Sequence, residues 1–418
     1  MTRYIIRRLL QSIPVLFFIS MAVYGLILIS PVDPLAIYED NPDITPEDMA
    51  MLEWRLGLRQ PAFINLRGSW GRIKVDSVDL YNKPQPSEGS PSPPKVVAQL
   101  PGDTRVAIID AEKVEGQRWL KVLEVNKRIT GWTPAANLTV RINPFDSRYF
   151  KWLFAILRGD WGKSNVEHRS ALGMILERLP ATMYLMSIAT LGQMLIAIPI
   201  GVYSALKQYS LLDYVFTALA YMGRAMPIFW FGLLLIIVFH STLTWPSWIG
   251  GDLAGKPLFP GAGMYDIRRR GMPGYNAFLD YLHHLILPVT MLSVFGAARY
   301  MRYMRASMLE VIHMDYIRTA RAKGLTEQVV VYRHAFKNAA IPLVTIFAMD
   351  LPILFGGALF TETIFSWPGM GKLFFRSAMR VDYAVLMGIV VINATLIVFF
   401  NLLADIAYAF LDPRIRYE

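Results

Sequence analysis

The chain has 418 residues, of which 54% are hydrophobic and 18% charged, and its mean hydropathy is +0.36. These values are typical of a membrane protein, but they are low for a pure bundle of spanning helices, so we expect a water-soluble part as well. The sequence has no cysteine, which excludes disulfides, thiolate metal sites, iron–sulfur clusters and cysteine nucleophiles. The net charge of +10 fits either nucleic acid or an anionic membrane surface, and the positions of the cations decide between them.

Six stretches are long and apolar enough to cross a membrane. A spanning helix needs about 20 mostly apolar residues, because the hydrocarbon core is roughly 30 Å thick. The expected spans are residues 9–32, 179–206, a segment within 211–240, 282–298, 339–361 and 383–411. The first follows a basic start, as a signal peptide does, but it is too long for the apolar centre of one and no Ala-x-Ala site follows. We therefore expect an uncleaved helix.

The positions of the cations predict the orientation, since lysine and arginine near the ends of spans stay on the cytoplasmic side. Most of them fall on one side of a six-span layout, while the opposite short loops carry fewer. The densest cluster lies between the fourth and fifth spans and consists of Arg299, Arg302, Arg305, Arg318, Arg321, Lys323, Arg333 and Lys337. We expect a multi-pass protein of the plasma membrane with both termini in the cytoplasm and the segment between the first two spans outside. Much of the positive charge is then explained without nucleic acid.

Residues 62–143 differ in character from the rest of the chain. Short alternating stretches bounded by Gly, Pro, Ser and Asn predict small strands and turns. The expected strands are 71–75, 96–99, 104–110, 119–125 and 131–134, and residues 84–94 form a proline-rich loop.

This insert resembles bacterial Src-homology-3-like domains. The similarity rests on Val78 and Leu80 before Pro84, then Leu100-Pro-Gly102, and further on a strand through Trp119, Gly131-Trp132 and Asn137-Leu138. The resemblance implies a small β-barrel of five or six strands, and the distribution of cations places it outside the membrane. Two interpretations are open: the barrel recognises a partner, such as cell-wall material or a solute receptor, or it is a passive elaboration. For the side chains of Trp119 and Trp132 we favour a place in the core, where aromatic residues of small barrels usually lie.

The segment from Asp315 to Pro342 is the most informative part of the sequence. A basic helical run precedes Gly324, and Val329, Tyr332, Arg333 and Phe336 follow it at helical spacing. A helix, a glycine turn and a second helix on the cytoplasmic face suit a lever that docks in a groove of another protein. The alternative is a solvated basic face near anionic lipid.

Here the chain resembles the permease subunits of ATP-binding-cassette importers, in which this loop couples transport to ATP hydrolysis. The general signature, Glu-Ala-Ala-x3-Gly-x9-Ile-x-Leu-Pro, is only partly kept, since Arg318-Thr-Ala320 replaces Glu-Ala-Ala. The form found here, Tyr-Ile-Arg-Thr-Ala-Arg-Ala-Lys-Gly-Leu and then His-Ala-x-x-Asn-Ala-x-Ile-Pro, is similar to that of the oligopeptide, dipeptide and nickel branch. The coupling residues implied by the resemblance are Arg318, Thr319, Ala320, Gly324, Leu325, Tyr332, Ile341 and Pro342.

Further blocks similar to that branch cover the chain outside the insert. They are Leu56-Gly-Leu-x-x-Pro61, Gly159-Asp-Trp-Gly-x-Ser164, Glu362-Thr-Ile-Phe-Ser-Trp-Pro-Gly-Met-Gly371, Asp382-Tyr383, Asn401-Leu-Leu-Ala-Asp405 and Asp412-Pro-Arg414. The first two flank the insert. The resemblance therefore implies three parts: residues 1–61 with the first helix, the inserted barrel 62–143, and the permease core 144–418 with the other five helices.

Two charges fall within expected spans, Arg224 beside Pro227 and Asp350 beside Pro352. Charge at membrane depth costs at least a few kcal/mol and usually faces a water-filled path or a partner. One hypothesis is that both residues line the translocation pathway, as a pair or singly, and contact polar solute. The other is a structural ion pair, or an Arg224 that reaches the membrane surface because its helix begins later.

The sequence offers no sign of catalysis. Gly162-Lys-Ser164 resembles the end of a phosphate-binding loop, but Leu157 occupies the required first glycine position and no strand precedes it. The histidines are scattered, so we expect no metal site and no cofactor. ATP hydrolysis is expected on other subunits.

The expected fold is an all-α polytopic membrane protein of six helices with an inserted extracytoplasmic β-barrel. The resemblance implies a permease for peptides or similar polar solutes, and as partners a second permease subunit, two ATPase subunits and an extracellular solute-binding protein. Oligosaccharides or nickel are alternative solutes for the same machinery. Two other classes stay open: a membrane-anchored binding or adhesion protein that acts through its barrel, and a secondary transporter, although the two halves have no evident inverted repeat.

Overall fold

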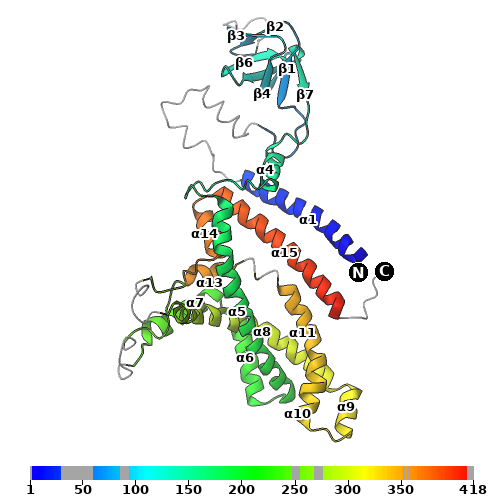
Figure 1. Ribbon diagram of the computed structural model, residues 1–418, viewed down its shortest axis with the longest axis vertical. Coiled ribbons are helices and arrows are strands. Elements are labelled where there is room, and N and C mark those ends of the chain that lie inside the picture. Colours follow the sequence, from blue (N-terminus) through cyan, green and yellow to red (C-terminus); the bar gives the residue numbers. More distant parts are fainter. Residues whose placement is uncertain are drawn as a thin grey trace. The chain divides into compact units, whose positions relative to one another are not determined.

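The computed structural model describes residues 2–29, 60–84, 94–246, 255–267, 276–351, 354 and 357–411. The chain divides into two compact units (Figure 1). One consists of Met1–Ser20 and Gly162–Glu418, and the other of Met21–Trp161. The division falls inside helix α1 (Thr2–Ile29).

The smaller unit contains a seven-stranded antiparallel sheet of order β3-β2-β6-β5-β4-β1-β7 (Figure 1). Successive side chains of a strand point to opposite faces, so each strand can bury one apolar face of the sheet. The buried apolar residues are Ile73, Val78, Leu80, Leu100, Val106, Leu120, Val122 and Leu138. The strands are β1 (Trp70–Ile73), β2 (Ser77–Tyr81), β3 (Val96–Pro101), β4 (Arg105–Val114), β5 (Gln117–Glu124), β6 (Ile129–Pro134) and β7 (Leu138–Arg141).

The hairpin between β4 and β5 has a two-residue loop. Glu115 and Gly116 both have positive φ, at 48° and 80°, as a tight turn that matches the twist of the strands requires. All five predicted strands overlap observed ones, while β2 and β7 were not predicted. Trp119 and Trp132 are 3% and 8% exposed, which confirms their place in the core. The Src-homology-3-like nature of the sheet stays a prediction.

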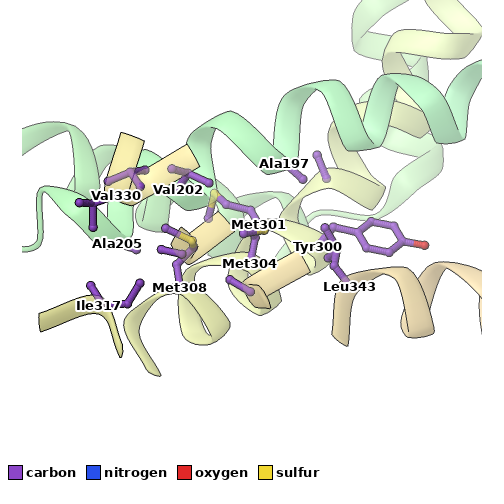
Figure 2. Packing of buried hydrophobic residues seen from close by; sticks show 14 of the residues in the cluster. Ala197, Val202, Ala205, Tyr300, Met301, Met304, Met308, Ile317, Val330 and Leu343 are labelled. Carbon is purple, nitrogen blue, oxygen red and sulfur yellow. The ribbon is translucent and has the colours of Figure 1, made fainter. Parts of the chain in front are cut away.

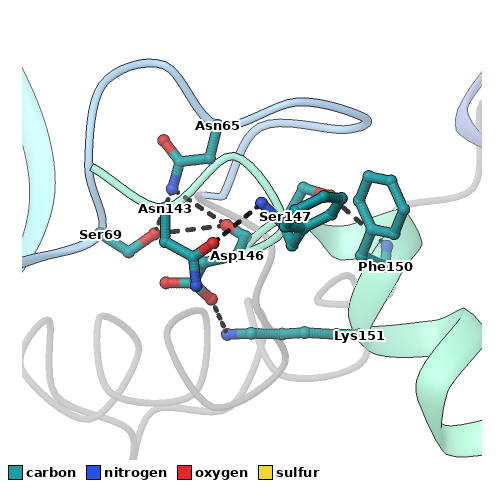
Figure 3. Close-up of polar contacts among 8 residues, drawn as sticks. Asn65, Ser69, Asn143, Asp146, Ser147, Phe150 and Lys151 are labelled. Atoms are coloured by element: carbon teal, nitrogen blue, oxygen red, sulfur yellow. Dashed lines mark hydrogen bonds and ion pairs between the residues drawn. The ribbon is translucent and has the colours of Figure 1, made fainter. Parts of the chain in front are cut away.

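The two ends of the sheet region come together (Figure 3). Asn65 is fully buried; its side-chain amide donates to the carbonyl of Asp146 at 2.9 Å, and its Oδ1 accepts from the amide of Gly68. Backbone bonds from Arg148 to Pro61 and from Tyr149 to Ala62 continue this seam. Helix α4 (Arg148–Leu157) starts there, capped by Ser147. A chain that leaves and returns at one place is typical of an inserted domain.

The larger unit is helical. Its elements are α5 (Ala171–Leu206), α6 (Leu211–Ala225), α7 (Ile228–Ile236), the π-helix η2 (Ile237–Thr242), α8 (Ala277–Ile312), α9 (Asp315–Ala322), α10 (Glu327–Val329), the π-helix η6 (Val330–Ala335), α11 (Phe336–Asp350), α13 (Leu359–Ile364), α14 (Met370–Met379) and α15 (Tyr383–Leu411).

Helices α5 and α8 form the central pair, and small residues let them approach. A Cβ atom built on Gly201 would lie 2.7 Å from the Cβ of Met304, and one on Gly192 would collide with Ser293. Only glycine permits such a crossing. Ser293 also donates from its hydroxyl to the carbonyl of Ala189 at 3.0 Å, so a polar contact reinforces the same interface.

The limits of the spans differ from the prediction, while their total number stays a prediction. Among the described residues, four helices are long and apolar enough to cross a membrane, or five if the bent pair of α6 with α7 and η2 is one span. The expected third span is two helices at 105°, because Pro227 follows Met226 and breaks the hydrogen-bond ladder. The expected fifth span contains α11, of 15 residues, and then runs into residues 352, 353, 355 and 356, which lie outside the described part.

The fourth span also ends later than predicted. Helix α8 continues to Ile312, so Arg299, Arg302 and Arg305 belong to the helix and not to a loop after it. At 36 residues it is about 54 Å long, more than the roughly 30 Å of a hydrocarbon core. Two of its arginines have acidic partners: Arg299 pairs with Asp350, and Arg305 lies 3.0 Å from Asp213.

Candidate functional site

The segment from α9 to η6 is held on a buried apolar cluster (Figure 2). Ile317 and Ala320 from α9 and Val330 from η6 belong to one buried cluster with Met304 and Met308 of α8. Val202 and Ala205 of α5 belong to the same cluster. These contacts fix the inner face of the segment, so its outer face keeps a defined orientation.

The outer face carries most of the predicted coupling residues. Arg318, Thr319, Gly324, Leu325 and Tyr332 are exposed, Tyr332 by 67%. Ala320 is the exception: it is 7% exposed and supports the segment from inside. Ile341 and Pro342 lie in the first half of α11 and are exposed as well.

A glycine turn joins α9 to α10. Gly324 has φ of +76°, in the left-handed region, and its amide donates to the carbonyl of Arg321 at 2.9 Å. Across the turn Arg321 forms two hydrogen bonds with Glu327, at 3.1 and 2.7 Å. The bond from Arg321 holds the pKa of Glu327 below its ordinary value. The predicted helix–glycine–helix arrangement is thus present.

A second feature is a cleft of about 340 Å³ between α5, α8 and α11. Its polar groups are Thr190 and Gln193 of α5, Arg299 and Tyr300 of α8, and Asp350 at the end of α11. Asp350 pairs with Arg299 and accepts a hydrogen bond from the hydroxyl of Tyr300. The apolar part of the lining is Met186, Ile228, Leu292, Phe295, Phe347, Leu351 and Leu354.

The two charges singled out in the sequence have different surroundings. Asp350 lines the cleft, with Arg299 as its cationic partner. Arg224 lies near the end of α6, and its side chain is outside the described part of the structure. Sequence reasoning missed Arg299 because it read this residue as one of many loop cations. The available signal was its place directly beside Tyr300 at the edge of an apolar stretch.

Two of the remaining motif blocks meet in the fold, whereas residues 56–59 and the block 412–414 lie outside the described residues. Ser164 donates to Asp382, 218 residues further along the chain, and Asp382 also accepts from the amide of Asn165 at 3.3 Å. Asp382 is 2% exposed. The Gly159–Ser164 block and the Asp382-Tyr383 block therefore form one polar contact that holds the loop before α5 on the start of α15.

The block from Glu362 to Gly371 is a second polar node. The fully buried carboxylate of Glu362 accepts from the hydroxyl of Thr182 at 2.8 Å and from the amides of Lys372 and Ala358 at 3.0 and 3.3 Å. Trp367, also fully buried, donates from its indole to the carbonyl of Ala181 at 3.0 Å. These residues tie the short helices α13 and α14 to α5.

No group of three or more His, Asp or Glu side chains that could hold a metal ion occurs among the described residues. The adjacent histidines bond to backbone carbonyls instead: His283 to Leu258 at 2.9 Å and His284 to Asp280 at 2.8 Å.

Comparison with known proteins places the helical part in a family. Residues 197–417 match the model of the binding-protein-dependent transport system inner membrane component. The oligopeptide transport system permease protein AppB of Bacillus subtilis (strain 168) is 43% identical over 271 residues, 65% of this chain and 80% of that protein. The dipeptide transport system permease protein DppB of Escherichia coli (strain K12) is 38% identical over 281 residues, 66% of this chain and 82% of that protein.

Similarity extends to other organisms and to a solved structure. The di/tripeptide transport system permease protein DppB of Pseudomonas aeruginosa (strain UCBPP-PA14) is 37% identical over 275 residues, 66% of this chain and 82% of that protein. The inward-facing MetNI methionine ABC transporter is matched with a TM-score of 0.43 and 15% identity, over 57% of this chain and 96% of that chain. The chain belongs to the family of inner membrane components of binding-protein-dependent transport systems.

Proposed function

We propose that this chain is the permease subunit through which an ATP-driven importer moves peptides across the membrane. The observation that carries the proposal is the 43% identity to an oligopeptide permease over 80% of that protein's length. Relatives described as dipeptide and di/tripeptide permeases favour small peptides over the alternatives of oligosaccharides or nickel.

The outer face of α9, its glycine turn and η6 is the proposed docking surface for the ATPase subunits. Arg318, Thr319, Gly324, Leu325 and Tyr332 would contact the ATPase, and Ala320 would support them from the buried side. Ile341 and Pro342 lie within α11, so they would transmit the movement along this helix toward its end at Asp350. Closure of two ATPases on ATP would then move the docked segment and change the access of the helix bundle.

The remaining partners and the topology follow from the same assignment. We infer a second permease subunit beside this one and an extracellular receptor that delivers the peptide. The six-span layout, cytoplasmic termini and an extracytoplasmic sheet are supported by the distribution of cations. The sheet region 62–143 is proposed as an inserted Src-homology-3-like domain, and the seam around Asn65 supports an insertion at one point of the permease.

Asp350 and Arg224 are proposed to line the translocation pathway. For Asp350 the support is its place in the wall of the 340 Å³ cleft between α5, α8 and α11. Its pairing with Arg299 explains how a carboxylate is tolerated inside a helix bundle.

Reconstitution tests the proposal. The permease pair, both ATPases and the receptor are placed in proteoliposomes, and accumulation of a labelled dipeptide is followed with and without ATP. Uptake that needs ATP and persists with an uncoupler is expected. A secondary transporter would give uptake driven by an ion gradient without ATP. A binding or adhesion protein would give none, and no ATPase would co-purify with it.

The role of the insert needs a separate variant. Deletion of residues 62–143 joins chain ends that already lie close together, so the permease is expected to remain foldable. Loss of receptor docking in that variant would identify the insert as a recognition domain, whereas unchanged docking and uptake would make it a passive elaboration.

A further inference from the structure

The lining of the cleft between α5, α8 and α11 is largely apolar, and it also carries two opposite charges that meet. Arg299 contributes a guanidinium from the middle of α8, and Asp350 contributes a carboxylate from the end of α11. Tyr300 donates to the same carboxylate. The pair is therefore a junction between two helices, and it is open to a molecule inside the cleft.

The two members of the pair are unequally covered. The side chain of Arg299 is 46% exposed, whereas that of Asp350 is 17% exposed. Tyr300 contacts both members: its hydroxyl donates to Asp350, and the guanidinium of Arg299 lies over its ring, 5.1 Å from the centroid. Removal of Arg299 would leave the largely covered carboxylate of Asp350 without its cation, which is costly. The pair can therefore open at little cost only for a ligand that satisfies both charges.

A zwitterion meets that condition. We propose that Arg299 and Asp350 recognise the two charged termini of a short peptide, Arg299 by donating to the carboxylate and Asp350 by accepting from the ammonium group. This inference rests on the proposed function as a peptide permease. One internal ion pair is replaced by two pairs with the ligand, and the net charge of the cleft is zero before and after binding.

The rest of the cleft suits the body of such a ligand. A volume of about 340 Å³ lies at the lower end of the range for small-molecule sites and fits a short peptide. Gln193 places an amide beside Gly296, at a point where any Cβ on residue 296 would collide with it, and donates to the carbonyl of Leu292 at 3.3 Å. Phe295 and Phe347 offer apolar walls for the side chains of the peptide.

The charge balance predicts that a peptide lacking one of its two terminal charges binds more weakly than the free peptide. An N-acetylated peptide has no ammonium group, so it leaves Asp350 without a partner once Arg299 has turned to the carboxylate. A peptide amide has no carboxylate and leaves Arg299 unpaired in the same way. A hydrogen bond to a charged group contributes enough binding free energy to change a dissociation constant about tenfold. Each blocked peptide should therefore bind about tenfold more weakly than the free one.

A role as a mere latch between α8 and α11 is the competing explanation. The two helices flank the segment from α9 to η6, so a broken latch would disturb transport as well. A latch, however, does not distinguish peptides that differ only at their termini. The test must therefore compare ligands within each variant.

The experiment uses the complete complex of permeases and ATPases in lipid nanodiscs, without receptor, so that the receptor's selectivity does not enter. Labelled dialanine is bound and displaced by dialanine, N-acetyl-dialanine and dialanine amide. In Asp350→Asn the penalty for N-acetylation should vanish while that for amidation remains. In Arg299→Gln the penalty for amidation should vanish while that for N-acetylation remains.

Arg305→Gln is the matched control. Arg305 pairs with Asp213 at 3.0 Å between α8 and α6, and neither residue lines the cleft. This variant should keep both preferences of the wild-type complex. Equal weakening of all three ligands in both cleft variants, or no preference in the wild-type complex, would overturn the inference. ATP-driven uptake of dialanine by the complete system with receptor reports on the proposed function independently of these ratios.

Discussion

The turn at Gly324 offers a sharp test of how the proposed coupling segment works. Its φ of +76° lies in the left-handed region, and no atom outside the turn lies within 4 Å of where a Cβ would stand. A substitution there is therefore resisted only by the backbone. The left-handed conformation costs an ordinary residue about 1–2 kcal/mol, and a β-branched residue more.

This cost is enough to change the population of the turn. A penalty of 1–2 kcal/mol alters an equilibrium by roughly 5- to 30-fold. Gly324→Val should therefore lower ATP-driven uptake by about that factor, while Gly324→Asn, which tolerates the left-handed region, should retain most of it. Uptake and co-purification of the ATPase are measured in parallel.

Gly116 supplies the control. It has φ of +80° and equally open surroundings, but it lies in the hairpin of the sheet unit. Gly116→Val should carry a similar backbone penalty and leave ATPase co-purification unchanged. Equal losses of uptake in Gly324→Asn and Gly324→Val would mean that side-chain bulk on the surface, and not backbone conformation, sets the effect. Wild-type uptake in Gly324→Val would mean that the conformation of this turn does not limit coupling.

Three further predictions concern stability. Glu362→Gln sets an amide in place of a buried carboxylate that accepts three hydrogen bonds, and should destabilise the helical unit by about 1–3 kcal/mol in thermal unfolding; Glu177→Gln, in an exposed pair, should have little effect. Gly201→Leu should overpack the α5–α8 crossing at Met304 and cost about 1–3 kcal/mol, unlike Gly223→Leu, where a Cβ meets nothing within 4 Å; equal stability of the two would contradict the close approach. Because the pKa of Glu327 is lowered, its bond with Arg321 stabilises the turn at pH values above the ordinary carboxyl pKa, and this stabilisation is lost as pH falls through the lowered pKa. Both side chains are exposed, so the pH-dependent change in the stability of the turn, measured by amide exchange, should be at most about 1 kcal/mol. Glu327→Gln should abolish this pH dependence.

Periodicity and motif explain what the sequence predicts well. Alternation identified strands such as the one through Trp119, because one face of a sheet must be apolar throughout. Strand β7 was missed because it has only four residues and follows directly on a 3-10 turn at Ala135–Asn137. The apolar stretch of α8 marked the membrane part of the helix but not its end, since helical backbone continues through charged residues as far as Ile312.

Long-range pairing explains what was not predicted. Asp350 stood out as a charge within an apolar stretch, yet nothing in its neighbourhood along the chain indicates Arg299, 51 residues earlier. The buried bonds of Glu362 to Thr182 and of Asp382 to Ser164 link positions about 200 residues apart in the same way. Motif blocks marked Ser164, Glu362 and Asp382, but only the packing of helices reveals their partners. The break at Pro227 was open to prediction, since proline interrupts a helix.

This chain is proposed to transmit work from ATP to the movement of peptide. The most direct measurement is accumulation of a labelled dipeptide in proteoliposomes that contain the permease pair, both ATPases and the receptor. We predict accumulation that requires ATP hydrolysis and the receptor and that is insensitive to collapse of ion gradients. Accumulation without ATP that stops when an ion gradient is removed would show that this chain is not part of an ATP-driven importer.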